Sequence, residues 1–333
     1  MVWGIVLTAN EPTALVECNV RWHLATGASA VFVFLDDPDD RAGTRLAAIP
    51  GCTVQRCDDA YWQARRPNHG RPASQMRRQV INANRAQNQC GLDWLFHIDA
   101  DEFIWQDGDL QAELAAHDDP RTELNLPVLE RMFPEGDQVS LFDGPFRATS
   151  DLQTNETEAA FGPFERFMKR GQYSHGAGKS GVRVGVGLRL GVHNATRTGS
   201  EGRQRRAAKR VSSAARLLHF DGLTPLHWAA KFLRYLQNPE TVQSAILQPH
   251  RAAQIAWMQE RCTDVQSMRN AHRTMFAATA QRQSQLEQFG LLETIAFDPA
   301  CVLGADCPDL SVDAFDAELL HRNPGLKSLL ADI

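Results

Sequence analysis

Apolar runs separated by polar turns predict alternating buried strands and helices in the first third of the chain. Residues 2–7 and 30–35 are almost wholly apolar, as expected of strands buried on both faces of a parallel sheet. Between them, residues 13–26 carry apolar side chains at helical spacing, and Gly27 ends that helix. Strand, helix and strand in this order predict a right-handed βαβ unit. We therefore expect an α/β protein with a mainly parallel sheet.

The same alternation continues to about residue 129. The further helices and strands that it predicts are, in chain order, 41–48, 53–55, 73–90, 95–98, 109–117 and 123–129. No Gly-x-Gly-x-x-Gly follows the first strand, which argues against a dinucleotide-binding fold.

The pattern changes in the second half of the chain. Residues 131–200 are rich in glycine and aromatic side chains without a long helical period, so we expect loops and β-ribbon there. Residues 225–290 predict a mostly helical tail, which could serve homodimer formation or peripheral membrane contact. Residues 298–311, with three prolines and two cysteines, predict irregular structure, and 312–331 one or two short helices.

A short acidic segment follows the apolar strand near residue 95. Asp99 and Asp101 are two residues apart, so an extended chain would point both carboxylates to one side. Two carboxylates held that close repel each other unless a cation lies between them, and oxygen ligands favour Mg²⁺ or Mn²⁺ shared with substrate phosphates. The alternative is that these acids cap a helix beginning near Asp107 or Asp109.

Polar residues also follow the first two predicted strands. Asn10 and Glu11 come after the first, and the acidic turn with Asp36 and Asp37 comes after the second. Because parallel strands end at the same edge of a sheet, these groups and the acids after residue 98 are expected around one crevice.

Two basic positions are candidates for binding phosphate. Arg78, on the helix that precedes the acidic strand, could hold a pyrophosphate, or it could pair with a nearby acid. Lys179 follows Gly176 and Gly178, but this spacing does not match a Walker A motif. The spacing is consistent with two alternatives: Lys179 binds a phosphate, or the glycines only form a turn.

Charge and composition restrict the partners. A net charge of −5 gives no reason to expect nucleic acid as the partner. The basic tract 203–210 is either a lid that meets phosphate or an anionic acceptor polymer, or a solvated loop. The seven cysteines include no Cys-x-x-Cys pair, and no signal peptide or transmembrane segment is evident, so we expect a cytoplasmic protein.

His193 ends an apolar run, and a residue this far along the chain could lie at the crevice again and bind the metal. A structural role is the alternative.

The chain resembles the family 2-like glycosyltransferases, and in particular the bacterial subgroup related to family 92. The hallmark strand of that subgroup reads like Trp-Leu-x-x-Ile-Asp-Ala-Asp-Glu-Phe, which residues 94–103 match. Residues 7–11 are similar to the first-strand motif of the family but carry Ala9 where lysine is common.

Three looser similarities support the resemblance, at residues 179–183, 191–193 and 218–220. The resemblance implies a GT-A catalytic domain over residues 1–222 and a mostly helical extension over 223–333. It also implies a nucleotide-sugar donor such as a UDP-sugar, a glycan or polysaccharide acceptor and a Mn²⁺ or Mg²⁺ cofactor, as in bacterial polysaccharide biosynthesis.

The resemblance and the charge pattern together give a set of expected site residues. Those expected to bind the donor are Asn10, Glu11, Asp36, Asp37, Arg78, Asp99 and Lys179. Those expected to bind the metal are Asp99, Asp101 and His193.

Family 2 enzymes invert the anomeric carbon, which implies a carboxylate that acts as base on the acceptor hydroxyl. Glu130, at a predicted strand end, is the first candidate and Asp151 the second. Two other functions stay open: a metal-dependent nucleotidyltransferase, which would release pyrophosphate, and a non-catalytic GT-A-like binding module, which the departure at Ala9 would suit.

Overall fold

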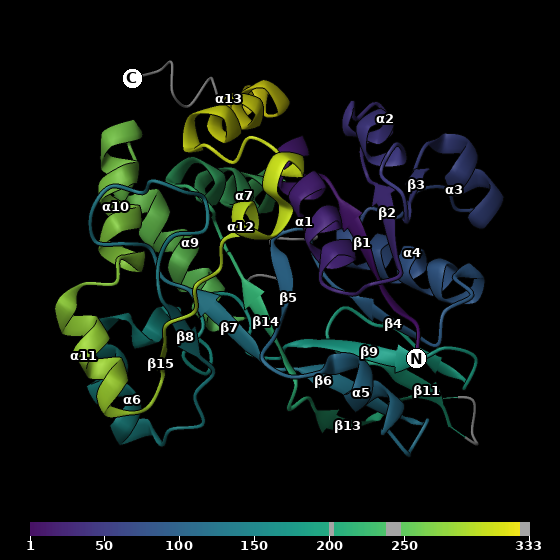
Figure 1. Ribbon diagram of the computed structural model, residues 1–333. Helices are drawn as coiled ribbons and strands as arrows, with labels where there is room; N and C mark the ends of the chain where they lie inside the picture. The colour runs from purple at the N-terminus through teal and green to yellow at the C-terminus, as the bar shows by residue number, and fades with distance from the viewer. Residues whose placement is uncertain (200–202, 238–247, 327–333) are drawn as a thin grey trace. The chain divides into compact units, whose positions relative to one another are not determined.

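The computed structural model describes residues 1–199, 203–237 and 248–326 (Figure 1). The described chain forms two compact units, each built from three separate stretches. Unit 1 contains residues 1–128, 177–217 and 299–308, and unit 2 contains the described parts of 129–176, 218–298 and 309–333. The boundary expected between a catalytic domain and a helical extension, after residue 222, stays a prediction.

Unit 1 holds most of the strands. Its strands are β1 (Trp3–Ala9), β2 (Ala30–Leu35), β3 (Cys52–Arg56), β4 (Trp94–His97), β5 (Glu102–Gln106), β6 (Thr122–Leu126), β9 (Lys179–Arg183), β10 (Leu188–Arg189), β11 (Thr196–Thr198), β12 (Gln204–Arg206) and β13 (Ala208–Val211). Its helices are α1 (Thr13–Ala25), α2 (Ala42–Ala47), α3 (Asp59–Arg65), α4 (Gln75–Gln89), α5 (Leu110–Ala115), α12 (Pro299–Leu303) and the 3₁₀ helix η2 (Gly304–Asp306).

Seven of the described strands form the main sheet of unit 1, in the order β13-β6-β9-β4-β1-β2-β3. The central strands β4, β1, β2 and β3 pair in parallel, as do β13 and β6. Strand β9 alone runs antiparallel to its neighbours β4 and β6. The predicted α/β class, with a mainly parallel sheet flanked by helices, is therefore confirmed, and this is the arrangement expected of a GT-A fold.

Alternating side chains of the strands supply two cores, one on each face of this sheet. Ile5 and Leu7 of β1 point into a core with residues of α1, α2 and α5, whereas Val6 points into a core with residues of α3 and α4. The strand residues are buried on both faces because helices cover both faces, which explains why these strands read as continuous apolar runs.

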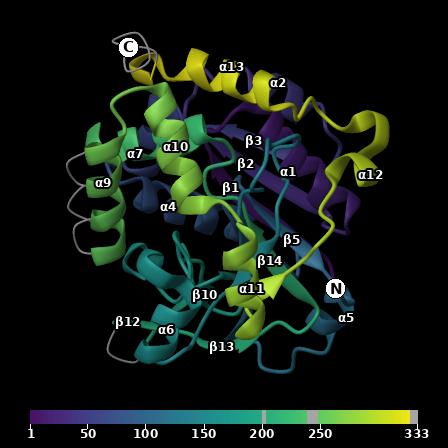
Figure 2. The same cartoon turned by 90° about the vertical axis from the view of Figure 1, so that its left-hand side faces the viewer.

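Unit 2 is mainly helical. Its described helices are α6 (Thr154–Phe161), the 3₁₀ helix η1 (Gly162–Phe167), α7 (Pro225–Gln237), α9 (Pro249–Arg261), α10 (Val265–Phe276), α11 (Ala280–Gln288) and α13 (Val312–Arg322). Helices α9 and α10 lie side by side (Figures 1 and 2), and α11 packs against α6. Strands β8 (Phe146–Ala148) and β15 (Leu292–Glu293) pair antiparallel, and the chain passes between the units within β7 (Val128–Arg131) and β14 (Ala215–His219).

Several local expectations need correction. The stretch 131–200, expected to be loops and ribbon, also contains α6, a helix of only eight residues whose apolar side chains are consecutive and so show no helical period in the sequence. The basic tract 203–210 is not a loop over its length, since it forms β12 and β13. The tract 298–311, expected to be irregular, begins with α12 and η2. A homodimer through the C-terminal helices stays a prediction.

The seven cysteines are free thiols. Among the residues that the structure describes, no helix combines the length and the apolar character that a membrane span requires.

We expect Gly181→Ala to destabilise unit 1. A Cβ at position 181 of β9 would lie 2.6 Å from Cζ of Phe96, whose ring is fully buried on the neighbouring strand β4. Overpacking of this kind costs about 1–3 kcal/mol, which urea denaturation would measure. Gly136→Ala is the control, because a Cβ there meets no atom within 4 Å; equal stability of the two variants would contradict the packing argument.

Candidate functional site

The carboxyl ends of three parallel strands carry most of the predicted site residues. Asp36 follows β2, and its backbone N–H donates to Ala9 O at the end of β1 (2.9 Å). On the other side of β1, the backbone N–H of Ile98 after β4 donates to Val6 O (3.1 Å). The groups that follow β1, β2 and β4 therefore lie along one edge of the sheet of unit 1, as the sequence predicts.

A buried lysine organises the acidic end of β4. Lys179, the first residue of β9, is fully buried, and its Nζ lies 2.6 Å from Asp99 Oδ2 and 3.3 Å from Glu102 Oε2. The antiparallel register of β9 and β4 places the start of β9 beside the end of β4. The structure thus brings together Asp99 and Lys179, two of the residues predicted to bind the donor.

The ion pair sets the protonation of both partners. Burial by itself would raise the pKa of Asp99, but the ammonium of Lys179 and the hydrogen bond from it lower that pKa from 3.8 to about 2. Burial would lower the pKa of Lys179, but Asp99 and Glu102 more than reverse this and raise it. The site therefore holds a protonated Lys179 beside an ionised Asp99 at neutral pH.

The segment between the acids is a turn and not an extended strand. The Glu102 N–H donates to Asp99 O (3.1 Å), and the Asp99 N–H donates to Glu102 Oε2 (2.7 Å). The expectation that Asp99 and Asp101 project to one side of a strand is therefore wrong, because β4 ends at His97 and β5 begins at Glu102. The capping alternative is also excluded, since Asp109 caps α5 through the Ala112 N–H (2.8 Å).

Side chains of helix α1 form hydrogen bonds with the backbone of this turn and of β5. The Asn19 side-chain amide donates to Ala100 O (3.2 Å) and to Glu102 O (2.7 Å). His23 accepts from the Ile104 N–H at Nε2 (3.0 Å), so its Nδ1 carries the proton and donates to Asn19 O (2.7 Å). Burial lowers the pKa of His23 to about 4, which keeps the ring neutral. The acidic turn is thus fixed by buried hydrogen bonds.

Asp36 and Arg78, both predicted to bind the donor, bind each other. Arg78 Nε and Nη2 each donate to one oxygen of Asp36 at 2.7 Å, a bidentate pair, while Arg71 Nη2 lies 3.1 Å from Asp36 Oδ2. The pairing of an arginine with a nearby acid, the alternative raised for Arg78, is what the structure shows. Asp37 and Asn10 are exposed and Glu11 is half-buried.

His193 lies next to the buried lysine. Its backbone carbonyl accepts from Ser180 Oγ (2.9 Å), and its Nδ1 is 3.3 Å from Gly178 O. Because a carbonyl can only accept, Nδ1 carries the proton, and Nε2 of the neutral ring has the lone pair that a metal ligand needs. Gly178 has φ +69, and a Cβ there would collide with Leu126 O, so a glycine is also required sterically in the turn before Lys179.

In unit 2, Glu130 is a buried and fully engaged carboxylate. It accepts from Arg147 Nη2 (2.5 Å), from the Tyr173 N–H and Ser174 N–H (2.8 Å each) and from Ser174 Oγ (2.5 Å). Burial would raise its pKa, but Arg147 and His219 lower it. These contacts support a structural role, and the role of base stays a prediction.

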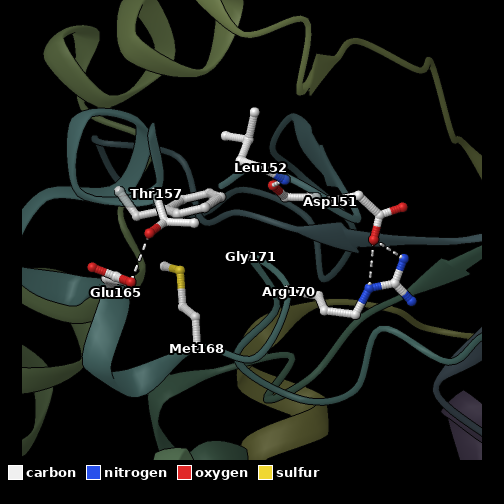
Figure 3. A pocket seen from close by; sticks show the side chains of 9 residues that line it. Asp151, Leu152, Thr157, Glu165, Met168, Arg170 and Gly171 are labelled. Carbon is white, nitrogen blue, oxygen red and sulfur yellow. Dashed lines mark hydrogen bonds and ion pairs between the residues drawn. The ribbon is translucent and has the colours of Figure 1, made fainter. Parts of the chain in front are cut away.

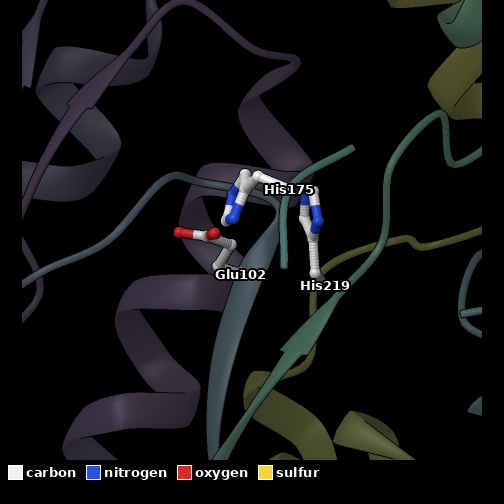
Figure 4. A group of neighbouring side chains, drawn as sticks. All are labelled: Glu102, His175 and His219. Atoms are coloured by element: carbon white, nitrogen blue, oxygen red, sulfur yellow. The ribbon is translucent and has the colours of Figure 1, made fainter. Parts of the chain in front are cut away.

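The same network fixes the tautomer of a histidine. Ser174 Oγ gives its proton to Glu130, so at 2.9 Å it accepts from His219 Nδ1, and Nε2 is the nitrogen that holds the lone pair whenever the ring is neutral. The rings of His175 and His219 stack with centroids 5.1 Å apart (Figure 4). A ring nitrogen of each lies within 4.8 Å of the other, and His219 and Asp221 also have ligand atoms within 4.8 Å. Within unit 2, these are donor types that suit Mn²⁺ or Zn²⁺.

Asp151, the second candidate base, lies in a different environment. Its side chain is 84% exposed, and Arg170 Nη2 lies 2.6 Å from Oδ1. The structure leaves its role a prediction.

Sequence reasoning missed several residues of the site. Glu102 belongs to the acidic segment but has no assigned role there, and Gln79 donates to Asp99 Oδ1 (2.6 Å). The signal for Gln79 is present in the sequence: amide side chains occupy positions of α4 that a helix of this kind gives to buried residues, and Gln79 and Asn82 are both buried. His219 lies in the stretch 218–220, one of the looser similarities noted in the sequence, but the sequence predicts no role for it, and His175 has no comparable sequence signal.

No protein-family profile and no curated protein sequence matches the chain. Among solved structures, the chain resembles galactosyltransferase LgtC in complex with donor and acceptor sugar analogs, with 14% identity and a TM-score of 0.25 over 54% of this chain and 57% of LgtC. It resembles S. aureus TarS 1–349 with 11% identity and a TM-score of 0.31 over 99% of this chain and 87% of that one. It resembles GalNAc-T7 with UDP, GalNAc and Mn²⁺ with 10% identity and a TM-score of 0.33, over 78% of this chain and 56% of that one. The chain thus spans little more than half of LgtC and of GalNAc-T7, and likenesses with TM-scores this low carry no argument about its function.

We expect Lys179→Met to destabilise the protein by about 3 kcal/mol, because it leaves the buried Glu102 and the half-buried Asp99 without their cation. Denaturant unfolding followed by circular dichroism would measure the loss. Lys209→Met is the matched control, since Lys209 is exposed on β13 and should change stability by less than about 0.5 kcal/mol. A Lys179 variant as stable as the control would show that the ion pair contributes nothing.

The stabilising effect of Asp99 should depend on pH. Its pKa in the folded protein is lowered from 3.8 to about 2, so the unfolded chain takes up the proton first as the pH falls. The difference in melting temperature between the native protein and Asp99→Asn should be constant above pH about 5 and shrink as the pH falls below about 4. A difference that stays constant down to pH 3 would contradict the lowered pKa.

Proposed function

We propose that the chain is a metal-dependent glycosyltransferase that moves a sugar from a nucleotide-diphosphate donor to a hydroxyl of a glycan acceptor, with inversion at the anomeric carbon. The observation that carries the proposal is the ion pair between the buried Lys179 and the half-buried Asp99, 2.6 Å apart, at the edge where β1, β2 and β4 end. In open α/β sheets this edge is the usual ligand-binding crevice.

Asp101 is the better of the two predicted aspartate ligands for a divalent cation. Both oxygens of Asp99 already accept hydrogen bonds, from Lys179 and Gln79, and a second cation beside that ammonium would be repelled. Asp101 is 6% exposed and lies within the turn, between the two carbonyls to which Asn19 of α1 donates. Its carboxylate suits both Mg²⁺ and Mn²⁺, and a histidine nitrogen such as Nε2 of His193 would favour Mn²⁺. Asp99, Asp101 and His193 are not among the groups of described residues whose ligand atoms all lie within 4.8 Å of one another, so His193 as a ligand of the same ion is part of the proposal.

The remaining roles follow from where each side chain lies. Asn10, Glu11 and Asp37 would bind the nucleoside, while Asp36 and Arg78, fixed to each other, would shape that end of the crevice. Lys179 would hold Asp99 ionised and correctly oriented for the donor. A bound cation would supply Lewis-acid neutralisation of the departing diphosphate.

For the base, we favour Asp151 over Glu130. The Glu130 oxygens accept four hydrogen bonds from buried donors, and taking up a proton would cost that network. Asp151 is exposed and lines a cavity of unit 2, so an acceptor hydroxyl can reach it.

Asp101→Asn should reduce Mn²⁺-dependent hydrolysis of the donor by at least ~100-fold and leave folding intact, because it removes a charged ligand without changing side-chain volume. The measurement is release of nucleoside diphosphate from a panel of nucleotide sugars with and without Mn²⁺. Asp118→Asn, an exposed acid of the same unit, is the control and should keep full activity.

Three outcomes would count against the proposal. Unchanged turnover of the Asp101 variant would remove Asp101 from the site. Release of pyrophosphate in place of nucleoside diphosphate would indicate a nucleotidyltransferase. Absence of any binding of nucleotide sugars to the native protein, measured by calorimetry with Mn²⁺, would indicate a non-catalytic module.

A further inference from the structure

Unit 2 contains an open cavity of about 340 Å³ between α6, η1 and the turn at Arg170 (Figure 3). Its apolar lining comes from Leu152, Phe161 and Met168. Phe161 and Met168 also pack against the hydrophobic core of the unit, so the apolar wall is rigid. A cavity with a fixed apolar wall and a few polar groups is the usual form of a small-molecule site.

The polar groups of the cavity form two hydrogen-bonded pairs, one on each side of it. On one side, Arg170 Nε and Nη2 donate to Asp151 Oδ1 at 3.0 and 2.6 Å. On the other side, Thr157 Oγ1 donates to Glu165 Oε1 at 2.7 Å (Figure 3). The cavity therefore presents carboxylates as acceptors and a guanidinium as donor, separated by apolar side chains.

Arg170 has an unfavourable backbone conformation in the turn that carries it. Lys169 and Gln172 pair across a two-residue turn in which Arg170 has φ +54 and Gly171 has φ +76. Among the described residues, Arg170 is the only one other than glycine with a positive φ. Such turns favour Asn followed by Gly, because a long side chain is strained in the left-handed region.

The contacts of the Arg170 guanidinium are exposed and do not explain an arginine at this position, although Nη1 also donates to Gly176 O (3.2 Å). Its ion pair with Asp151 is exposed, with 45% of the Arg170 side chain and 84% of the Asp151 side chain accessible, and exposed pairs contribute little. Strain in a turn that lines a cavity is the kind of feature found at binding sites. Gly171 has a steric role as well, since a Cβ there would lie 2.7 Å from the Phe161 ring.

We propose that this cavity binds a sugar ring of the acceptor glycan. The C–H face of a pyranose would pack on Phe161 and its apolar neighbours, and its hydroxyls would donate to Asp151 and Glu165 and accept from Arg170. A hydroxyl is both donor and acceptor, so a neutral sugar satisfies all three groups. An anionic ligand fits less well, because two carboxylates face one guanidinium. The acceptor role rests on the proposed function, whereas sugar binding itself does not.

The test is Arg170→Asn, with binding measured by saturation-transfer NMR against methyl glycosides of glucose, galactose, mannose, N-acetylglucosamine and N-acetylgalactosamine. The native protein should bind at least one of them. Because Asn suits the turn, the variant should melt roughly 2–4 °C higher than the native protein. It should nevertheless bind the sugar at least ~10-fold more weakly, since it loses the guanidinium and releases Asp151.

Arg273→Asn is the matched control, because Arg273 is an exposed arginine on α10 and its loss should leave binding unchanged. Absence of binding to every glycoside by the native protein would overturn the inference, and so would undiminished binding by the Arg170 variant. Sugar binding that Arg170→Asn weakens, in a protein that hydrolyses no nucleotide sugar, would keep the sugar site and refute the proposed transferase. Hydrolysis of a nucleotide sugar by a protein that binds none of the methyl glycosides would support the proposed transferase and refute the sugar site.

Discussion

The fully buried ammonium of Lys179 is the interaction on which the candidate site depends. Removing such a group from water costs several kcal/mol, and only close carboxylates can offset that cost. Asp99 and Glu102 do so, at 2.6 and 3.3 Å. Because these residues stand at the end of β4, the start of β5 and the start of β9, one ammonium fixes three chain segments at the edge of the sheet.

This arrangement separates the two aspartates that the sequence places together. Asp99 is held by Lys179 and Gln79, so its charge is already balanced by the protein. Asp101 lies one step further along a turn that α1 holds from behind. Two neighbouring acids thus acquire different chemistry, one as a fixed part of the frame and one as a candidate ligand, because their surroundings differ and not their spacing.

The sequence predicts the parallel sheet and its polar edge well, because buried strands and helical periods are local signals. It predicts Asp99 and Lys179 as parts of one site, although only the antiparallel register of β9 with β4 makes them neighbours. It does not predict that Arg78 forms its ion pair with Asp36, since that pairing depends on how α4 lies against the sheet. The same limit applies to Glu130: the sequence shows an acid at the end of a strand, but it does not show that Tyr173 and Ser174, more than forty positions away, donate hydrogen bonds to that acid.

The interleaving of the two units affects how the chain can fold as it is synthesised. Helix α12 belongs to unit 1 and packs against α1, yet about 270 residues separate the two helices, and these include most of unit 2. A ribosome therefore releases the last piece of the first unit only after nearly all of the second has emerged. Until then the surface of α1 that α12 covers is exposed, so the nascent chain is expected to need protection of this surface late in translation.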